Sequence, residues 1–298
     1  MLRFMVLVAF GVMSMLTPAW ADGKIKVVAS FSILEDMVRN VGGDRVSVSA
    51  LVGSDGDAHM FTPSPADVQK VSTAQVLVVN GLGFEGWMDR LVQASGFTGE
   101  RIAATIGVNA IKSQEDGHGH DHIAFDPHAW QSVKNARLYV INIRDGLIKA
   151  DPDGAEIYKA NARAYMNKLD ELDVHVREVV SRLAQDKRKV VTSHDAFAYF
   201  GAEYGLRFIG ARGLSDDAEP SAQGVAQLIR QIRDEKVRTL FIENRASPKL
   251  LNQIARETGV KVGGKLYADV LSPADGPAPS YIQMMQYNIR TLYDGLKE

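Results

Sequence analysis

The 298-residue chain contains no cysteine. This absence excludes disulfides, thiolate metal sites, iron–sulfur clusters, cysteine nucleophiles and a lipid anchor on cysteine. Any metal site must therefore be built from His, Asp and Glu. Histidine is also scarce, at seven residues, so the positions of these seven carry most of the information about metal binding.

The chain also lacks an excess of positive charge. It has 34 Lys+Arg against 36 Asp+Glu, a formal net charge of −2. Proteins that bind nucleic acid or anionic membranes usually carry a basic surplus or patch, so neither partner is expected. Hydrophobic residues make up 46% and charged residues 23%, as in an ordinary globular protein, and the length suggests about two domains.

One long apolar run stands at the start of the chain. Residues 1–21 contain an early Arg3, an apolar stretch and an Ala-Trp-Ala ending, which together are typical of a cleaved secretory signal peptide. The stretch, about 13 residues, is shorter than the roughly 20 that a membrane-spanning helix needs. We therefore expect a mature protein that begins after Ala21 and is soluble in the bacterial periplasm, because it offers no cysteine for lipidation.

The mature chain is predicted to form two α/β halves joined by one long helix. In residues 22–150, strands are predicted at 25–29, 46–52, 76–80 and 101–106, and helices at 32–41, 65–73, 84–94 and 132–149. In residues 187–298, strands are predicted at 189–193, 206–209, 238–242 and 260–266, and helices at 196–204, 221–235, 248–258 and 279–296.

Between the halves, apolar residues recur at spacings of three and four from about 152 to 185, which predicts a linking helix within 151–186. Alternating strands and helices favour parallel sheets. The expected fold class is thus α/β, with two (β/α) lobes that have parallel four-stranded sheets and are joined by one long rigid helix. Ligands of such open sheets bind at the carboxyl ends of the strands, here between the lobes.

Three histidines lie where this cleft would gather them. His59 follows the second predicted strand, His128 precedes the helix at 132–149, and His194 ends the first strand of the second half. Imidazole binds zinc and other divalent metals at neutral pH. A fourth ligand has to be a carboxylate, and Asp269, at the end of the last predicted strand, is the best-placed candidate. Any one of them could be an ordinary loop residue, so the prediction depends on the four together.

Several motifs, in this order, resemble the metal-binding solute-binding proteins of zinc and manganese ABC importers, the cluster A-I family of TroA-like and ZnuA-like proteins. The resemblance spans nearly all of residues 24–297. The segments that carry it are His59 with the following Pro63-Ser64-Pro65-Ala66-Asp67, then 78–81 (VVNG), 126–130 (DPHAW), 193–200 (SHDAFAYF), 219–221 (EPS) and 264–269 (GKLYAD).

The resemblance implies an interlobe metal site with His59, His128, His194 and Asp269 as ligands. It also implies a membrane permease and an ATPase as partners, and we expect a monomer. Three imidazoles and one carboxylate favour Zn²⁺, which accepts four-coordination. Relatives that carry Mn²⁺ or Fe²⁺ usually have Glu at the position of His194, yet three-histidine members linked to manganese exist, so these ions stay the alternative.

A further segment, residues 115–122, places His118, His120 and His122 among acidic residues. Such a composition is metal-seeking. The segment is predicted to be either a low-affinity collecting loop, which could also contact a periplasmic metal donor, or an ordinary solvated loop.

Binding is favoured over catalysis. A catalytic zinc usually has three protein ligands and keeps a position open for water, whereas four candidate ligands suit capture. The sequence contains no HExxH motif, Gly-x-Ser-x-Gly elbow or Walker A loop. A periplasmic zinc hydrolase remains the remote alternative.

Overall fold

The computed structural model describes residues 23–54, 56–113, 124–211, 222–244 and 248–297. The signal peptide expected at 1–21 and the histidine-rich segment at 115–122 lie outside the described residues. Among the helices within these described ranges, none combines the length and the hydropathy that crossing a bilayer requires.

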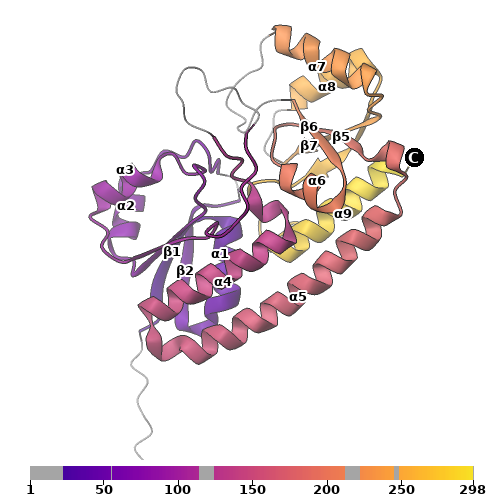
Figure 1. The fold of residues 1–298 in the computed structure, drawn as a ribbon. Helices are drawn as coiled ribbons and strands as arrows, with labels where there is room; N and C mark the ends of the chain where they lie inside the picture. The colour runs from indigo at the N-terminus through magenta and orange to yellow at the C-terminus, as the bar shows by residue number, and fades with distance from the viewer. Residues whose placement is uncertain (1–22, 55, 114–123, 212–221, 245–247, 298) are drawn as a thin grey trace, which may run out of the picture.

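The first lobe contains a parallel four-stranded sheet in the order β2-β1-β3-β4. Its strands are β1 (Ile25–Phe31), β2 (Val46–Val52), β3 (Val76–Val79) and β4 (Glu100–Ala103). Its helices are α1 (Ser32–Gly42), α2 (Pro65–Ser72), α3 (Met88–Ser95) and α4 (Val133–Ala150). Helices α1 and α4 pack together beneath the sheet, and α2 pairs with α3 at the outer end of the lobe (Figure 1).

The second lobe repeats this arrangement with the order β6-β5-β7-β8. Its strands are β5 (Lys189–Thr192), β6 (Arg207–Gly210), β7 (Thr239–Glu243) and β8 (Lys261–Leu266). Its helices are α6 (Ala198–Tyr204), α7 (Ala222–Asp234), α8 (Pro248–Thr258) and α9 (Tyr281–Leu296). The predicted α/β class, with one parallel four-stranded sheet in each lobe, is confirmed.

One long helix, α5 (Ala155–Ser181), runs along both lobes (Figure 1). Its 27 residues extend about 40 Å at 1.5 Å per residue. It is shorter than the predicted 152–185, because Pro152–Gly154 and Gln185–Lys187 form tight 3₁₀ turns at either end. At its start, Arg45 and Tyr158 both donate hydrogen bonds to the carboxylate of Asp151, which fastens the helix to the first lobe.

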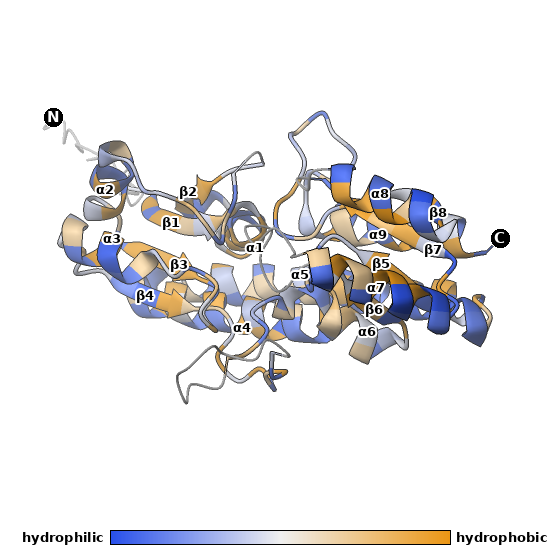
Figure 2. Cartoon of the chain, turned by 90° about the horizontal axis from the view of Figure 1, so that it is seen from above, coloured by the Kyte–Doolittle hydropathy of each residue, from blue (hydrophilic) through white to orange (hydrophobic). Residues whose placement is uncertain are grey.

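The hydrophobic core is continuous from one lobe to the other. The larger of two clusters of buried side chains extends from Ile25 to Leu296 and includes the inner face of α5. The smaller cluster lies within the second lobe and includes Val191, Leu240 and Ile254. Figure 2 shows the inner strands β1, β3, β5 and β7 as mostly hydrophobic and the outward faces of α3, α7 and α8 as hydrophilic. The domain boundaries at 150 and 186 stay a prediction, because this core and α9 join the lobes.

Helix α3 begins at Met88 and not at the predicted residue 84. Leu82 has a φ of 55°, between two glycines that also have positive φ, so the chain makes a tight turn there. The side chain of Glu85 then folds back and accepts hydrogen bonds from the N–H groups of Asn80 and Gly81. These backbone bonds at the end of β3 hold residues 84–87 outside the helix.

We expect the two lobes to keep their relative orientation when metal is added. Besides the shared core, the N–H of Tyr281 donates to Asp36 at 3.0 Å and the N–H of Leu271 donates to Ser32 Oγ at 3.0 Å, and a wide hinge opening would break both bonds. Small-angle X-ray scattering of the same protein with and without Zn²⁺ should give superimposable curves. A clear decrease in the radius of gyration on adding metal would contradict this rigidity.

Candidate metal centre

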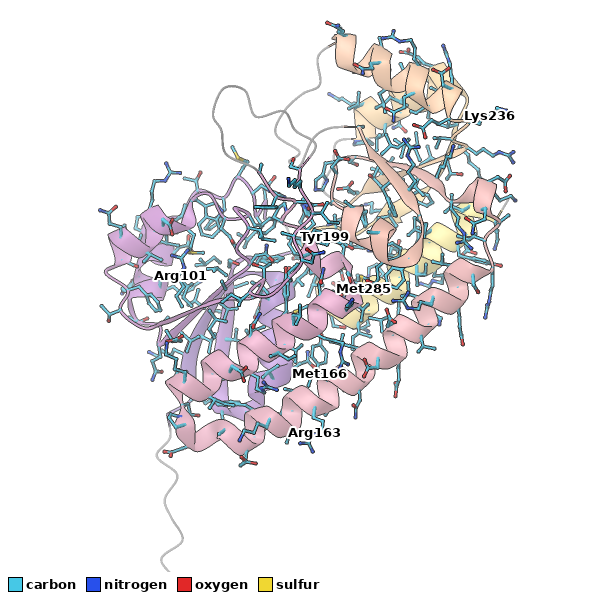
Figure 3. All side chains as sticks on the ribbon, viewed as in Figure 1. Arg101, Arg163, Met166, Tyr199, Lys236 and Met285 are labelled. Carbon is cyan, nitrogen blue, oxygen red and sulfur yellow. The ribbon has the colours of Figure 1, made fainter. Side chains whose placement is uncertain are left out.

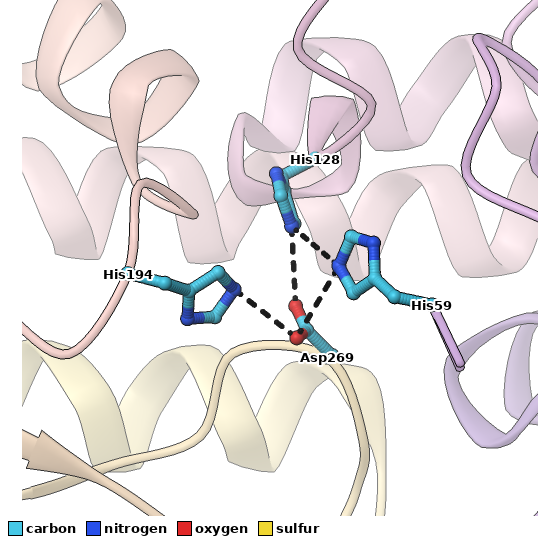
Figure 4. A group of neighbouring side chains, drawn as sticks. All are labelled: His59, His128, His194 and Asp269. Atoms are coloured by element: carbon cyan, nitrogen blue, oxygen red, sulfur yellow. Dashed lines mark hydrogen bonds and ion pairs between the residues drawn. The ribbon is translucent and has the colours of Figure 1, made fainter. Parts of the chain in front are cut away.

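The four side chains predicted as ligands meet between the lobes (Figure 4). One donor atom from each of His59, His128, His194 and Asp269 lies within 4.8 Å of the others. The Nε2 atoms of His59 and His128 are 3.1 Å apart. Asp269 Oδ2 lies 3.2 Å from His194 Nε2 and 3.7 Å from His59 Nε2, and Asp269 Oδ1 lies 3.5 Å from His128 Nε2.

These separations fit a small cation at the centre of the group. A tetrahedral ion with donors at about 2.0–2.1 Å has edges of roughly 3.3–3.4 Å between donors. The separation between His59 and His128 and the three contacts with Asp269, at 3.1–3.7 Å, bracket that value, and all four donors lie within 4.8 Å of one another. The four side chains therefore need little rearrangement to coordinate one ion.

Each side chain comes from a loop at the carboxyl edge of a sheet or at a helix start. His59 lies in the connection from β2 to α2, and His128 lies just before the 3₁₀ turn Ala129–Gln131 that leads into α4. His194 follows β5 directly, and Asp269 follows β8. Because parallel strands end at the same edge of a sheet, each lobe presents its ligands to the other.

Two buried carboxylates stand behind the imidazoles. Asp126 Oδ1 lies 2.7 Å from His128 Nδ1 and also accepts the backbone N–H of His128 at 2.9 Å. Glu243 Oε2 forms an ion pair with His194 Nδ1. With a carboxylate at Nδ1, each ring presents Nε2 to the centre, which is the usual arrangement of metal-binding histidines.

Sequence reasoning did not assign a role to either carboxylate. Asp126 stands two residues before His128, in the same DPHAW motif, so its proximity could have suggested one. Glu243 is 49 residues from His194 in the sequence and carries no local motif. The structure brings them together because β7 pairs directly with β5.

Aromatic side chains exclude water from one side of the group. The ring of Phe84 packs edge-on against the His59 ring, with 4.5 Å between the ring centroids, and the centroids of the Trp130 and His128 rings are 5.3 Å apart. Burial is the main reason why the pKa of His59 falls to about 4; Asp269 opposes this change, and the imidazoles of His128 and His194 add to it. His59 is therefore neutral at pH 7, and the lone pair of its unprotonated ring nitrogen is free to bind a cation.

His194 and Asp269 form a coupled pair of charges. Burial alone would lower the pKa of His194, but the carboxylates of Glu243 and Asp269 hold it well above its usual value. Burial would raise the pKa of Asp269, but the imidazoles, His194 first, hold it below its usual range. Before a cation binds, a proton on His194 thus neutralises part of the charge of its two carboxylate neighbours.

Side chains from each lobe hold the ligand-bearing segments of the other. Trp130 Nε1 and Gln131 Nε2 donate to the carbonyl of Ala268 at 3.0 and 2.9 Å, one residue before Asp269. In return, the hydroxyl of Tyr199 donates to the carbonyl of Asp126 at 2.8 Å. Figure 3 shows Tyr199 at the junction of the lobes. Hydrogen bonds across the interface thereby fix the segments that carry the candidate ligands.

Of the remaining histidines, the structure describes only His175. His175 is exposed on α5, away from the group, as expected for a solvated helix position. His118, His120 and His122 fall outside the described residues, so their predicted role stays a prediction. A small pocket beside the group is lined by Asp57, Ala58, His59, Glu243, Asn244, Ala268 and Asp269.

Three imidazoles and one carboxylate meet between two α/β lobes, each built on a parallel sheet, and one long helix links the lobes. These features define the class of two-lobed, helix-linked metal-binding proteins. Residues 27–295 match the family described as zinc-uptake complex component A, periplasmic. The chain belongs to this family of non-enzymatic, metal-binding substrate-binding proteins of ABC importers, which confirms the resemblance seen in the sequence.

Curated relatives are similar over almost their whole length. The manganese-binding lipoprotein MntA of Halalkalibacterium halodurans is 35% identical over 279 residues, which cover 93% of this chain and 90% of that protein. The iron-binding protein YfeA of Yersinia pestis is 33% identical over 278 residues, which cover 93% of this chain and 88% of that protein.

Solved structures share the fold. The manganese-bound periplasmic metal binding protein of Candidatus Liberibacter asiaticus has a TM-score of 0.82 at 31% identity, covering 92% of this chain and 100% of that chain. The periplasmic zinc binding protein TroA of Treponema pallidum has a TM-score of 0.85 at 30% identity, and the match covers 92% of this chain and 99% of that chain. The names of these similar proteins thus include manganese, iron and zinc.

Metal affinity should fall steadily as the pH is lowered from 8. Because the pKa of His194 is raised, an ion that binds must displace a proton there, so affinity should change by about tenfold per pH unit while one proton is displaced. Titration calorimetry in buffers of different ionisation enthalpy should detect about one proton released per ion at pH 7. Affinity that does not change between pH 5 and pH 8 would contradict binding by these imidazoles.

Proposed function

We propose that this chain captures one divalent metal ion with His59, His128, His194 and Asp269 and delivers it to the permease of an ABC importer, powered by an ATPase. The observation that carries the proposal is the convergence of four donor atoms, two from each lobe, within 4.8 Å. His59 and His128 bind from the first lobe, and His194 and Asp269 bind from the second.

We propose Zn²⁺ as the ion that this site binds most tightly. Three neutral nitrogen donors suit zinc better than manganese, which binds imidazole more weakly and prefers oxygen. The donor separations of 3.1–3.7 Å also match the size of a four-coordinate zinc site.

Manganese is the second candidate, and two observations favour it. Similar proteins are named for manganese, including the relative that is 35% identical and a solved structure with a TM-score of 0.82. Both oxygens of Asp269 also approach imidazole nitrogens, Oδ1 towards His128 and Oδ2 towards His194. A carboxylate in this orientation can bind through both oxygens and provide a fifth donor for a larger ion.

Removal of single ligands should identify the site. Asp269→Asn and His128→Ala should each weaken zinc binding by at least about 100-fold, because the first removes the negative charge of the carboxylate ligand and the second removes an imidazole ligand. Competition calorimetry with zinc and manganese checks this, with His175→Ala as the matched control for loss of a histidine. Unchanged zinc affinity in both ligand variants would exclude the proposed site.

We also propose that the mature protein is a soluble periplasmic carrier. Several relatives are named lipoproteins, but the sequence of this chain contains no cysteine to which a lipid could be attached.

Protein released from native cells by osmotic shock should contain one equivalent of zinc by elemental analysis. Recovery in the membrane fraction would contradict a soluble carrier, and one equivalent of manganese would make manganese the cargo.

A further inference from the structure

We propose that Glu243 sets the preference of the site for zinc over manganese by positioning His194. This inference depends on the proposed function, in which His194 is a ligand. Glu243 ends strand β7 and is 2% exposed. It is a buried charged side chain that makes no direct contact with the centre of the group, and capture of the ion does not itself explain its presence.

The carboxylate of Glu243 holds both the backbone and the ring of its neighbour. Oε1 accepts the N–H groups of Ser193 at 2.9 Å and of His194 at 3.1 Å, and Oε2 contacts His194 Nδ1. In the opposite direction, the N–H of Glu243 donates to Ser193 Oγ at 3.1 Å. Three hydrogen-bond donors thus converge on the Glu243 carboxylate. Its contact with Nδ1, on the side of the ring away from the centre of the group, fixes the orientation of the His194 ring.

This contact affects the metal through the donor strength of the imidazole. A carboxylate at Nδ1 keeps a proton on that nitrogen, so the proton that an incoming ion displaces leaves from Nε2, which lies 3.2 Å from Asp269 Oδ2. The freed Nε2 is then the metal-binding atom, and the carboxylate at Nδ1 makes the ring a stronger donor. Zinc gains more than manganese from a strong nitrogen donor. Glu243 should therefore contribute to the affinity for zinc more than to the affinity for manganese.

Glutamine cannot replace this carboxylate. A carboxylate accepts hydrogen bonds through both oxygens, whereas an amide accepts through one end and donates through the other. If the new amide in Glu243→Gln accepted the two backbone N–H groups, its NH₂ group would face Nδ1 of His194. The ring would then carry its proton on Nε2, which blocks that nitrogen as a ligand. The alternative orientation of the amide leaves the two backbone N–H groups facing a donor.

The first lobe supplies a matched control in Glu85. Its carboxylate is also buried at the end of a sheet and accepts hydrogen bonds from Ser30 Oγ at 2.6 Å and from the N–H of Asn80 at 2.7 Å. Within the described part of the chain, the Glu85 carboxylate forms no hydrogen bond or ion pair with any of the four ligand side chains. Glu85→Gln therefore tests the structural cost of losing a buried carboxylate without touching a ligand.

The decisive experiment compares Glu243→Gln, Glu85→Gln and the full wild-type chain by competition calorimetry with Zn²⁺ and Mn²⁺, alongside thermal unfolding of the metal-free proteins. In Glu243→Gln, zinc affinity should fall about 10–100-fold and manganese affinity should fall less, so the ratio of the two affinities decreases. Glu85→Gln should lower the melting temperature and leave that ratio unchanged.

The outcomes separate this inference from the proposed function. If wild type binds neither ion tightly, the proposed function fails. If wild type binds zinc but Glu243→Gln leaves the affinity ratio unchanged, or weakens both ions equally, Glu243 has only a structural role and the inference is overturned.

A measurement on wild type covers the case in which Glu243→Gln does not fold. Long-range ¹H–¹⁵N spectra of the zinc-loaded, histidine-labelled protein should show His194 with a proton on Nδ1, protected from exchange, and with Nε2 bound to the metal. A metal-bound Nδ1, or a proton on Nε2, would overturn the inference.

Discussion

The structure depends on the mutual neutralisation of buried imidazoles and carboxylates between the lobes. An isolated charge in such a place would be strongly unfavourable. Here Asp126 faces His128, Glu243 faces His194, and Asp269 faces all three rings. The group carries more carboxylate than imidazolium charge once His59 is neutral, and this excess suits a dication. Its electrostatics and its donor geometry thus point to the same ligand.

Such a group requires that both lobes be held at a fixed distance. A displacement of one lobe by an ångström would change the separations of 3.5–3.7 Å between Asp269 and the imidazoles of His59 and His128, which lie on the other lobe. The shared core, α5 and the hydrogen bonds from Trp130, Gln131 and Tyr199 across the interface provide that fixed distance. Because the lobes are held rigidly, movement of a single ligand-bearing loop should require less free energy than opening of the whole cleft when the ion enters or leaves. His59 fits such a role, because it lies on a loop and, among the described residues, has no carboxylate at Nδ1.

Much of the fold follows from local patterns in the sequence. Short apolar strands alternate with amphipathic helices. Ser64 is the N-cap of α2, and the structure shows that Asp67 completes a reciprocal capping box. The errors occur where a tertiary contact competes with local propensity. Residues 84–87 resemble a helix start, yet Glu85 bonds to the end of β3, and the long helix is shortened by tight turns at both ends.

The four ligand candidates could be found from the sequence because each stands next to an element with a clear pattern, and because an all-nitrogen-and-oxygen site is the one kind that a chain without cysteine can build. What the sequence could not determine is which residues support them. Glu243 reaches His194 because β7 pairs with β5, and Tyr199 reaches Asp126 because the lobes are joined at a particular angle. Strand order and lobe orientation arise from contacts between distant residues, which no local pattern records. The sequence by itself therefore determined the donor types and their approximate places, whereas the tertiary structure decided their distances, the ring nitrogens that face the centre and the carboxylates that contact the rings from behind.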